Sequence, residues 1–516
     1  MRRGSRFDGP RGSDGSDRPA RQGWRAWLCH PALALVVGVL HTASFSPSPA
    51  WWLQPLALAW LIAACDGARP RRAALTGALF GVGWLASGLW WLYISMHDFG
   101  HLPAAVSALA VLALALFLST YYAAGMGLAA RWSAGAAPWR RALAFAGLWL
   151  GAELVRATFL TGFPWIASGY AHAQGPLAAF APYLGVYGIT ALAALVAAAL
   201  ALRRWALLAA LVVTIGAGQF LPQDFTRSTG TLAVSLVQPN IPQDQKFDRA
   251  RFDQNLDQLI ALIDAARGQV VITPESVLPV PLAFLDEEHV ERLRRGAETR
   301  PLLLGTFLGN STDGFVNSLV GVGFARRYDY GKRHLLPFGE FIPPGFHWFV
   351  KAMDIPLDDQ ASGTHEGALP FAGQRLRPLI CYEDLFGEDV VASALDSGEP
   401  AATVLVNVSN LAWFGPRMVQ DQHLQFSQMR ALEFQRPIVR ATNTGATAHV
   451  DHRGRVLARL PAEQAGVLEV SVDGRSGVTP YARWLAKLGL WPLWALAALG
   501  VLPVLGRRRP ASTRLA

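Results

Sequence analysis

The sequence has little charge and few cysteines. Only 16% of its 516 residues are charged, whereas 52% are hydrophobic, a balance too apolar for one ordinary soluble domain. The chain also lacks an HExxH motif, a paired-cysteine motif and a GxSxG elbow, so neither a metal centre nor a serine-hydrolase site is expected. The composition instead indicates a membrane protein, and we expect no cofactor.

Long apolar runs fill the first 220 positions, and one more run closes the chain. Crossing about 30 Å of hydrocarbon takes roughly 20 residues in a helix. We therefore expect a polytopic α-helical membrane domain with about eight transmembrane helices, near residues 31–46, 51–65, 73–95, 103–130, 142–160, 177–202, 205–221 and 484–505.

Arginine is concentrated in alternate loops between these runs. The second, fourth and sixth loops carry arginine, as do both chain ends, whereas the first and third loops have neither lysine nor arginine. Because cytoplasmic loops retain Lys and Arg, both termini are expected in the cytoplasm. Seven crossings then place the long mixed segment on the outer face, which is the periplasm of a bacterium. The net charge of +9 is attributed to these arginines, and no nucleic-acid partner is expected.

This organisation divides the chain into five parts. Residues 1–30 are rich in Gly, Ser, Arg and Asp without an apolar period, which predicts a disordered cytoplasmic tail. Residues 31–221 hold seven transmembrane helices, and residues 222–483 form the periplasmic domain. Residues 484–506 are the final transmembrane helix, and residues 507–516 a second cytoplasmic tail.

Within the outer segment, short β-rich runs alternate with segments of helical period. LAVSLVQPNI, QVVITPES and PLLLGTF are typical of strands, and DRARFDQNLDQLIALIDAA is typical of a helix. Apolar strands that alternate with helices predict an α/β domain whose sheet is covered on both faces. In such domains the reacting groups lie where strands end.

Three segments carry a carboxylate, an ammonium and a thiol. VVITPES delivers Glu275, YDYGKRHLLPFGEFIP carries Lys332 and Glu340, and RPLICYEDLF delivers Cys381. These groups suffice for acyl transfer, because the carboxylate can take the thiol proton, the thiolate can attack a carbonyl, and the ammonium can hold the oxyanion. Taken singly, each has an ordinary explanation: a helix cap, a solvated lysine, and a small buried cysteine.

The order Glu, Lys, Cys in ITPES, YGKRHLLPFGEF and LICYEDL resembles the nitrilase superfamily, also called CN hydrolases, which implies an α-β-β-α sandwich for the outer domain. The membrane runs narrow the resemblance to the apolipoprotein N-acyltransferase family. SGLWWLYISMHDFG, ELVRATFLTGFPW and GVTPYAR are similar to that family's membrane patterns. The resemblance extends over nearly the whole chain and leaves out only the tails.

The resemblance implies a ping-pong acyl transfer in the last step of bacterial lipoprotein maturation. Activated by Glu275, Cys381 would accept a fatty acyl chain from a phospholipid, typically phosphatidylethanolamine, as a thioester. The N-terminal amine of diacylglyceryl-cysteine on an apolipoprotein would then take that chain. Lys332 is assigned to the oxyanion, and the site is supported by Glu340, Glu383 and Tyr382. The family is treated as monomeric and resides in the inner membrane.

Four aromatic residues are candidates for lids or substrate contacts: Phe247, Trp348, Trp413 and Phe414. Their alternative is ordinary core packing. Phe247 stands where the family pattern has Trp, and this departure concerns lipid contacts rather than chemistry. A second departure is Leu411, which replaces the usual aspartate in NVSNLAWFG.

Two charged residues lie inside the fifth apolar run. Glu153 and Arg156 are one helical turn apart and are expected to pair. Intramembrane charges are costly and are functional candidates by default, but a purely structural ion pair is equally consistent with the sequence.

Two other functions remain open at this point. A membrane-tethered nitrilase-type amidase, which hydrolyses a small amide, would use the same three residues with water as the acceptor. A transporter or lipid-binding scaffold with an inactive nitrilase-like domain would not need Cys381.

Overall fold

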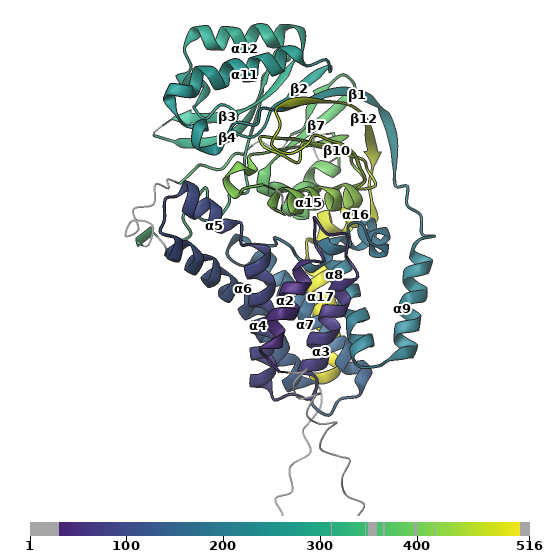
Figure 1. The fold of residues 1–516 in the computed structure, drawn as a ribbon. Coiled ribbons are helices and arrows are strands. Elements are labelled where there is room, and N and C mark those ends of the chain that lie inside the picture. The colour runs from purple at the N-terminus through teal and green to yellow at the C-terminus, as the bar shows by residue number, and fades with distance from the viewer. Residues whose placement is uncertain are drawn as a thin grey trace, which may run out of the picture.

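The computed structural model describes residues 30–310, 312–345, 347–348, 359–364, 367–396, 400–416 and 418–505. A bundle of helices lies below a domain of sheets and helices (Figure 1). The two predicted tails, residues 1–30 and 507–516, fall outside the described residues except for His30.

The bundle contains helices from both ends of the chain. Its long central helices pack side by side, while α5 and α6 lean outwards and α9 stands at one side (Figure 1). The helices are α2 (Leu33–Thr42), α3 (Leu53–Cys65), α4 (Pro70–Gly88), α5 (Leu92–Ile94), η1 (Ser95–Phe99), α6 (Ala104–Trp132), α7 (Pro138–Thr158), α8 (Ala181–Ala201), α9 (Trp205–Gly218), α16 (Pro480–Leu488) and α17 (Trp491–Leu505).

Several of these helices are long and apolar enough to cross a membrane. Among the described residues three meet this test alone, Ala104–Trp132, Pro138–Thr161 and Pro176–Ala201, and two bent pairs raise the number to five. The remaining apolar helices α2, α3 and α9 have 10, 13 and 14 residues and are shorter than a full span. The prediction of membrane helices is thus confirmed, and the number of eight is not.

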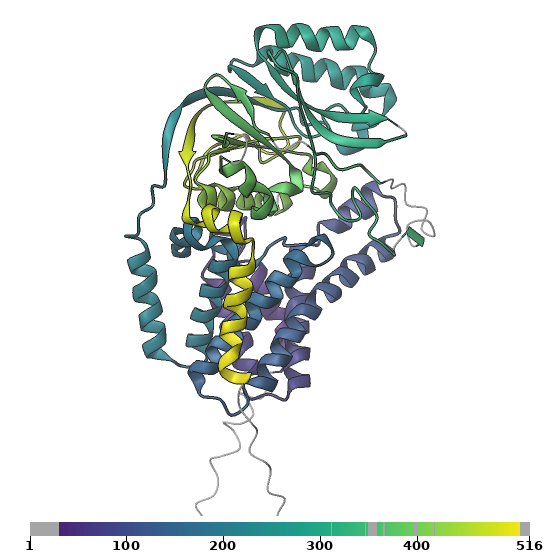
Figure 2. The same cartoon turned by 180° about the vertical axis from the view of Figure 1, so that it is seen from behind.

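The two bends change the expected boundaries. The chain turns by 62° between α4 and the α5–η1 segment, and by 90° between α16 and α17, the latter visible in yellow in Figure 2. Gly489 at the second bend has φ +56°, a conformation that glycine adopts without a steric penalty. The last apolar helix therefore begins at Trp491, although the apolar run led us to expect Trp484.

The upper domain is an α-β-β-α sandwich, as the resemblance implied. One sheet has the order β12-β1-β2-β3-β4-β5 and the other β11-β10-β9-β8-β7-β6. The strands are β1 (Thr226–Gln238), β2 (Val270–Ile272), β3 (Leu302–Asn310), β4 (Gly314–Val322), β5 (Tyr328–Gly331), β6 (Leu369–Phe371), β7 (Gln374–Ile380), β8 (Val404–Ser409), β9 (Ile438–Thr442), β10 (Ala448–Val450), β11 (Val456–Arg459) and β12 (Gly466–Gly477).

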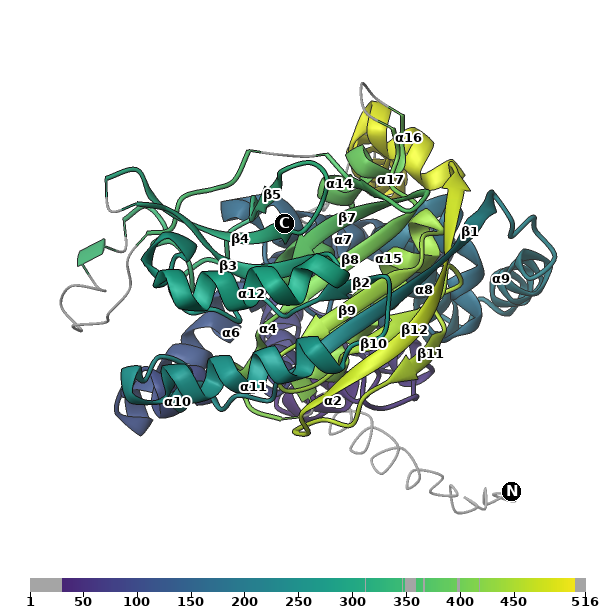
Figure 3. The ribbon, with the colours of Figure 1, turned by 90° about the horizontal axis from the view of Figure 1, so that it is seen from above.

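Helices cover the outer face of each sheet. Helices α11 (Phe252–Ala265) and α12 (Glu287–Thr299) lie over the first sheet (Figure 3), and α15 (Met418–Phe434) lies under the second (Figure 1). Between the sheets, buried Leu, Ile and Val side chains of β1, β2, β7, β8 and β9 form one apolar core. Such burial on both faces explains why these strands are continuous apolar runs.

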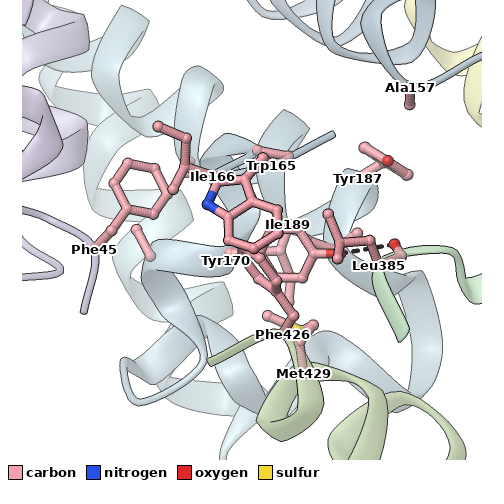
Figure 4. Close-up of a cluster of buried hydrophobic side chains, with 14 of the residues drawn as sticks. Phe45, Ala157, Trp165, Ile166, Tyr170, Tyr187, Ile189, Leu385, Phe426 and Met429 are labelled. Atoms are coloured by element: carbon pink, nitrogen blue, oxygen red, sulfur yellow. Dashed lines mark hydrogen bonds between the residues drawn. The ribbon is translucent and has the colours of Figure 1, made fainter. Parts of the chain in front are cut away.

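Helix α15 is covered on both sides, by the sheet above and the bundle below. Figure 4 shows Phe426 and Met429 of α15 packed against Trp165 and Tyr170, which precede α8 in the bundle. The Tyr170 hydroxyl also donates to the Leu385 carbonyl at 2.9 Å. The two parts of the molecule thus share one core, and polar side chains of α15 are buried with it.

Candidate active site

Cys381 follows directly after the last residue of β7. Its φ is +50°, in the left-handed region that costs a non-glycine residue about 1–3 kcal/mol. From there the chain turns into the short helix η7 (Cys381–Leu385), so the strand does not continue through Glu383. The thiol is only partly exposed. A turn of this kind presents one side chain at the end of a rigid, buried strand.

Glu275 lies in the loop after β2 and is almost fully buried. Its Oε1 accepts a hydrogen bond from Asn317 Nδ2 at 2.7 Å, and its Oε2 accepts one from the backbone N–H of Asn410 at 2.8 Å. A carboxylate held by two neutral donors is fixed in orientation.

Lys332 lies one residue beyond β5 and is 1% exposed. Its Nζ is 2.6 Å from Glu340 Oε1 and 3.5 Å from Glu275 Oε1. Burial alone would lower the pKa of Lys332, but the two carboxylates raise it above its ordinary value. The side chain is therefore a cation in the site, where it can meet a developing negative charge.

Cys381 is electrostatically coupled to the same groups. Burial raises the pKa of its thiol well above the usual value, Glu275 raises it further, and Lys332 opposes both. The resting thiol is therefore protonated at neutral pH. A protonated thiol needs a base to become a nucleophile, and Glu275 is the carboxylate with the largest effect on the pKa of this thiol.

Glu383 links the end of β7 to the segment that follows β5 and carries Lys332. Its Oε2 accepts from the Ile380 N–H at 2.6 Å and from the Tyr330 hydroxyl at 2.9 Å, and its Oε1 accepts from the Arg333 N–H at 2.8 Å. These bonds hold the two segments that carry Cys381 and Lys332 against one another.

The Tyr382 side chain contacts the helical bundle, at the segment between α7 and α8. Its hydroxyl donates to the Gly162 carbonyl at 3.1 Å, and its ring stacks on Phe163. The supporting roles expected for Glu340, Glu383 and Tyr382 stay predictions, and each has a defined contact at the site.

The four aromatic candidates lie in different surroundings. Trp413 contacts Phe99 of η1 and Phe247, with ring centroids 5.8 and 6.1 Å apart, and Phe414 packs on Trp91 at 4.8 Å. Phe247 is 53% exposed and Trp348 is 69% exposed. Neighbours of Trp348 at residues 346, 349 and 350 lie outside the described residues, so a lid role for this stretch stays a prediction.

Leu411 is buried in the core that the two parts share. Its side chain packs among apolar neighbours in place of the carboxylate that the family pattern has there.

Several residues at the site were missed by the sequence reasoning. They are Asn317, Asn407, Asn410, His423, Arg440 and Lys246. Lys246 is buried and donates to Ser276 Oγ at 3.0 Å, next to Glu275, and burial lowers its pKa to about 7 against the attraction of Glu275. The one available signal was a polar amide inside an apolar strand run, as with Asn317 in β4 and Asn407 in β8.

Glu153 and Arg156 form the expected ion pair. The distance from Arg156 Nη2 to Glu153 Oε2 is 2.7 Å, and both side chains are fully buried. Arg156 also donates to the carbonyls of Phe163 and Trp165, while Glu153 accepts from the Ser168 N–H. The pair thus holds the segment between α7 and α8, which contains the short 3-10 helices η2 (Phe159–Thr161), η3 (Ser168–His172) and η4 (Pro176–Phe180).

Glu153→Gln is expected to lower the unfolding temperature strongly in detergent. It leaves Arg156 buried without its counter-charge, and breaking a buried pair costs about 3–5 kcal/mol. Asp66→Asn is the matched control, because the Arg141–Asp66 pair has the same 2.7 Å distance but 25% side-chain exposure on both partners, and such pairs contribute about 0–1 kcal/mol. Equal losses in the two variants, measured by a thiol-independent thermal assay, would contradict the structural role.

Among the described residues there is no group of three or more His, Cys, Asp or Glu side chains that could hold a metal ion.

Comparison with known proteins gives matches over both parts of the chain. Residues 37–199 match the family described as Apolipoprotein N-acyltransferase N-terminal domain, and residues 233–481 match Carbon-nitrogen hydrolase. A protein from Ralstonia nicotianae named Apolipoprotein N-acyltransferase is 45% identical over 93% of this chain and 94% of its own length. A protein of the same name from Verminephrobacter eiseniae is 45% identical over 89% of this chain and 92% of its own length. A solved CN-hydrolase superfamily protein from Xanthomonas campestris is 19% identical, covering 50% of this chain and 96% of its own, with a TM-score of 0.36.

Proposed function

The chain belongs to the apolipoprotein N-acyltransferase family, and we propose that it transfers a fatty acyl chain from a membrane phospholipid to the N-terminal amine of diacylglyceryl-cysteine on an apolipoprotein. The observation that carries this function is the 45% identity to an enzyme of that name over 93% of the chain. The match of residues 37–199 to the family's own N-terminal domain favours acyl transfer over hydrolysis of a small amide, because an amidase has no need of that domain.

In the first half-reaction, Glu275 takes the proton of the Cys381 thiol. The thiolate attacks the ester carbonyl of the phospholipid, and Lys332 stabilises the resulting oxyanion. The carbon–oxygen bond then breaks, and Glu275 returns its proton to the leaving alkoxide. The products are a thioester on Cys381 and a lysophospholipid. The 3.5 Å distance between Lys332 Nζ and Glu275 Oε1 supports this division of roles.

In the second half-reaction, the amine of diacylglyceryl-cysteine attacks the thioester. Lys332 again meets the oxyanion, the carbon–sulfur bond breaks, and Cys381 leaves as a thiolate. Glu275 accepts the proton that the amine loses and passes it to the sulfur, which restores the resting site. The product is an amide, so the lipoprotein gains its third acyl chain.

The membrane part delivers both lipids to the site. Taking an acyl chain out of the bilayer into water costs about 0.8 kcal/mol per CH₂, so a site at the leaflet surface avoids a large barrier. We assign the chain to the bacterial inner membrane as a monomer with eight spans, a periplasmic catalytic domain and cytoplasmic termini. Phosphatidylethanolamine is the proposed donor.

The test is the intact mass of the purified protein in detergent after incubation with phosphatidylethanolamine. We expect a gain of one fatty acyl group that hydroxylamine removes, located by peptide mapping at Cys381 among the three cysteines of the chain. A diacylated lipopeptide with a free N-terminus, added next, should remove the acyl group from Cys381 and carry it as an amide. Folded protein that gains no mass would contradict a phospholipid donor, and discharge to water alone would contradict the acceptor.

A further inference from the structure

The backbone carbonyl of Cys381 is held by two buried side chains. Nε2 of His423, on α15, lies 3.1 Å from this oxygen, and Nδ2 of Asn407, on β8, donates to it at 3.2 Å. Asn407 is itself oriented, because its Oδ1 accepts from the Ser409 hydroxyl at 2.8 Å. Neither His423 nor Asn407 has a role in the acyl-transfer steps above.

Arg440 determines which nitrogen of His423 carries the ring proton. Its Nη2 is 2.6 Å from His423 Nδ1, and a guanidinium nitrogen can only donate. Nδ1 must therefore accept, which places the proton on Nε2. This nitrogen lies 3.1 Å from the Cys381 carbonyl oxygen and 3.2 Å from Asp384 Oδ1. Arg440 is kept in place by Asp384, whose Oδ2 is 3.1 Å from Nη1. All three side chains are fully buried.

The plane of the His423 ring is set by Trp165, which lies in the bundle between α7 and α8. The Trp165 indole stacks on it with an interplanar angle of 5° and ring centroids 5.7 Å apart. Trp165 is fixed in turn, because its indole N–H donates to Gln422 Oε1 at 2.7 Å and its carbonyl accepts from Arg156 at 2.8 Å. A continuous series of contacts thus joins the intramembrane ion pair to the residue that bears the thiol.

We propose that His423 is a positioning residue for the nucleophile: its Nε2–H, directed by Arg440 and oriented by Trp165, holds the peptide of Cys381 in the left-handed conformation that presents the thiol. The physical reason is the strain at φ +50°, which persists only where surrounding contacts over-determine it. Without the His423 donor, the Cys381 peptide can rotate and carry the sulfur away from Glu275 and Lys332. His423 transfers no proton in this role. The inference rests on the proposed function for its catalytic consequence, whereas the alkylation of Cys381 tests it without that function.

The test compares His423→Gln with His423→Asn in the full-length protein in detergent. A Gln amide reaches the place of the imidazole Nε2 and can still donate to the Cys381 carbonyl, whereas the shorter Asn amide reaches only the place of Nδ1. The first measurement is the rate at which iodoacetamide alkylates Cys381, followed by peptide mapping, which needs no lipid. The second is the split between kcat and KM for phosphatidylethanolamine in thioester formation, with its pH profile.

We expect His423→Asn to lower both the alkylation rate and kcat by about 100-fold, the effect of a displacement on the order of 1 Å, with KM unchanged. His423→Gln should restore both rates to within about threefold with the pH profile of the natural protein. Normal alkylation in folded His423→Asn would overturn the proposal. A changed pH profile in His423→Gln would overturn it too, because it would make His423 a proton-transfer group.

Asn407→Ser keeps the proposal testable if the His423 variants do not fold. It withdraws the other donor from the same carbonyl, so it should lower alkylation and kcat together and leave KM unchanged. Unaltered alkylation in this variant would contradict the role of the carbonyl. If the natural protein is alkylated rapidly but accepts no acyl group from phospholipid, the proposed function fails while the positioning role stands.

Discussion

Cys381→Ala is expected to abolish thioester formation and lipoprotein acylation altogether. In the proposed mechanism the acyl group is carried on the Cys381 sulfur, and alanine has no atom that can form the thioester. Intact mass and a lipopeptide acylation assay measure the two losses. The fold should survive, because a methyl group replaces a small, partly exposed side chain.

Cys65→Ala is the matched control for that substitution. Cys65 ends α3 in the bundle and is fully buried, so the same change of residue type should leave acylation intact. Acylation that persists in Cys381→Ala would contradict the covalent mechanism and support a scaffold whose outer domain is not catalytic. Loss in both variants would point to a folding defect instead.

Glu275→Gln is expected to slow thioester formation by about 10²–10⁴-fold, the usual contribution of a general base. The amide has nearly the shape of the carboxylate, yet it cannot take the thiol proton. Its NH₂ group also faces donors, namely Asn317 Nδ2 and Lys332 Nζ. Single-turnover acylation by phosphatidylethanolamine measures the effect. Glu288→Gln, an exposed position on α12, is the control and should react at the normal rate.

The pH dependence of Glu275→Gln gives a second, independent outcome. Burial keeps the pKa of the Cys381 thiol above its usual value, and Lys332 lowers it only in part. Without the base, the reactive thiolate must form by spontaneous ionisation, so the residual rate should rise about tenfold per pH unit below the thiol pKa. The natural protein should lack this steep rise near neutral pH. Equal pH profiles in the two proteins would contradict the role of Glu275 as base.

Local patterns in the sequence predicted the strands and helices of the outer domain, and the two-sheet sandwich followed from the resemblance to the nitrilase superfamily. Apolar strand runs such as QVVITPES and PLLLGTF became β2 and β3 because side chains buried on both faces of a strand must all be apolar. The helix expected in DRARFDQNLDQLIALIDAA is α11 for a similar reason. Helix ends and bends were harder to predict from the sequence. The 90° turn after α16, for example, depends on the conformation of Gly489 and on the packing of the two helices.

The sequence predicted the reactive groups of the candidate site but not the residues that hold these groups in place. Glu275, Lys332 and Cys381 stand at strand ends in motifs of distinctive residue types, so their meeting could be inferred from the order of segments. His423 and Arg440 carry no such signal, and Asn407 carries only that of an amide inside an apolar strand run. They come from α15, β8 and β9, and their bonds arise only when these elements pack behind β7.

By itself, the sequence determined the membrane character and the α/β class of the outer domain, because each depends on residue type and local spacing. The two-sheet sandwich and the acyl transfer to lipoproteins followed from the resemblance of its motifs to a known family. The tertiary structure alone decided how the thiol is held. The left-handed turn at Cys381 and the tautomer of His423 depend on contacts among β7, β8, β9 and α15. The stacking of Trp165 on His423 joins residues more than 200 positions apart. Such contacts depend on three-dimensional packing, for which a local pattern holds no information.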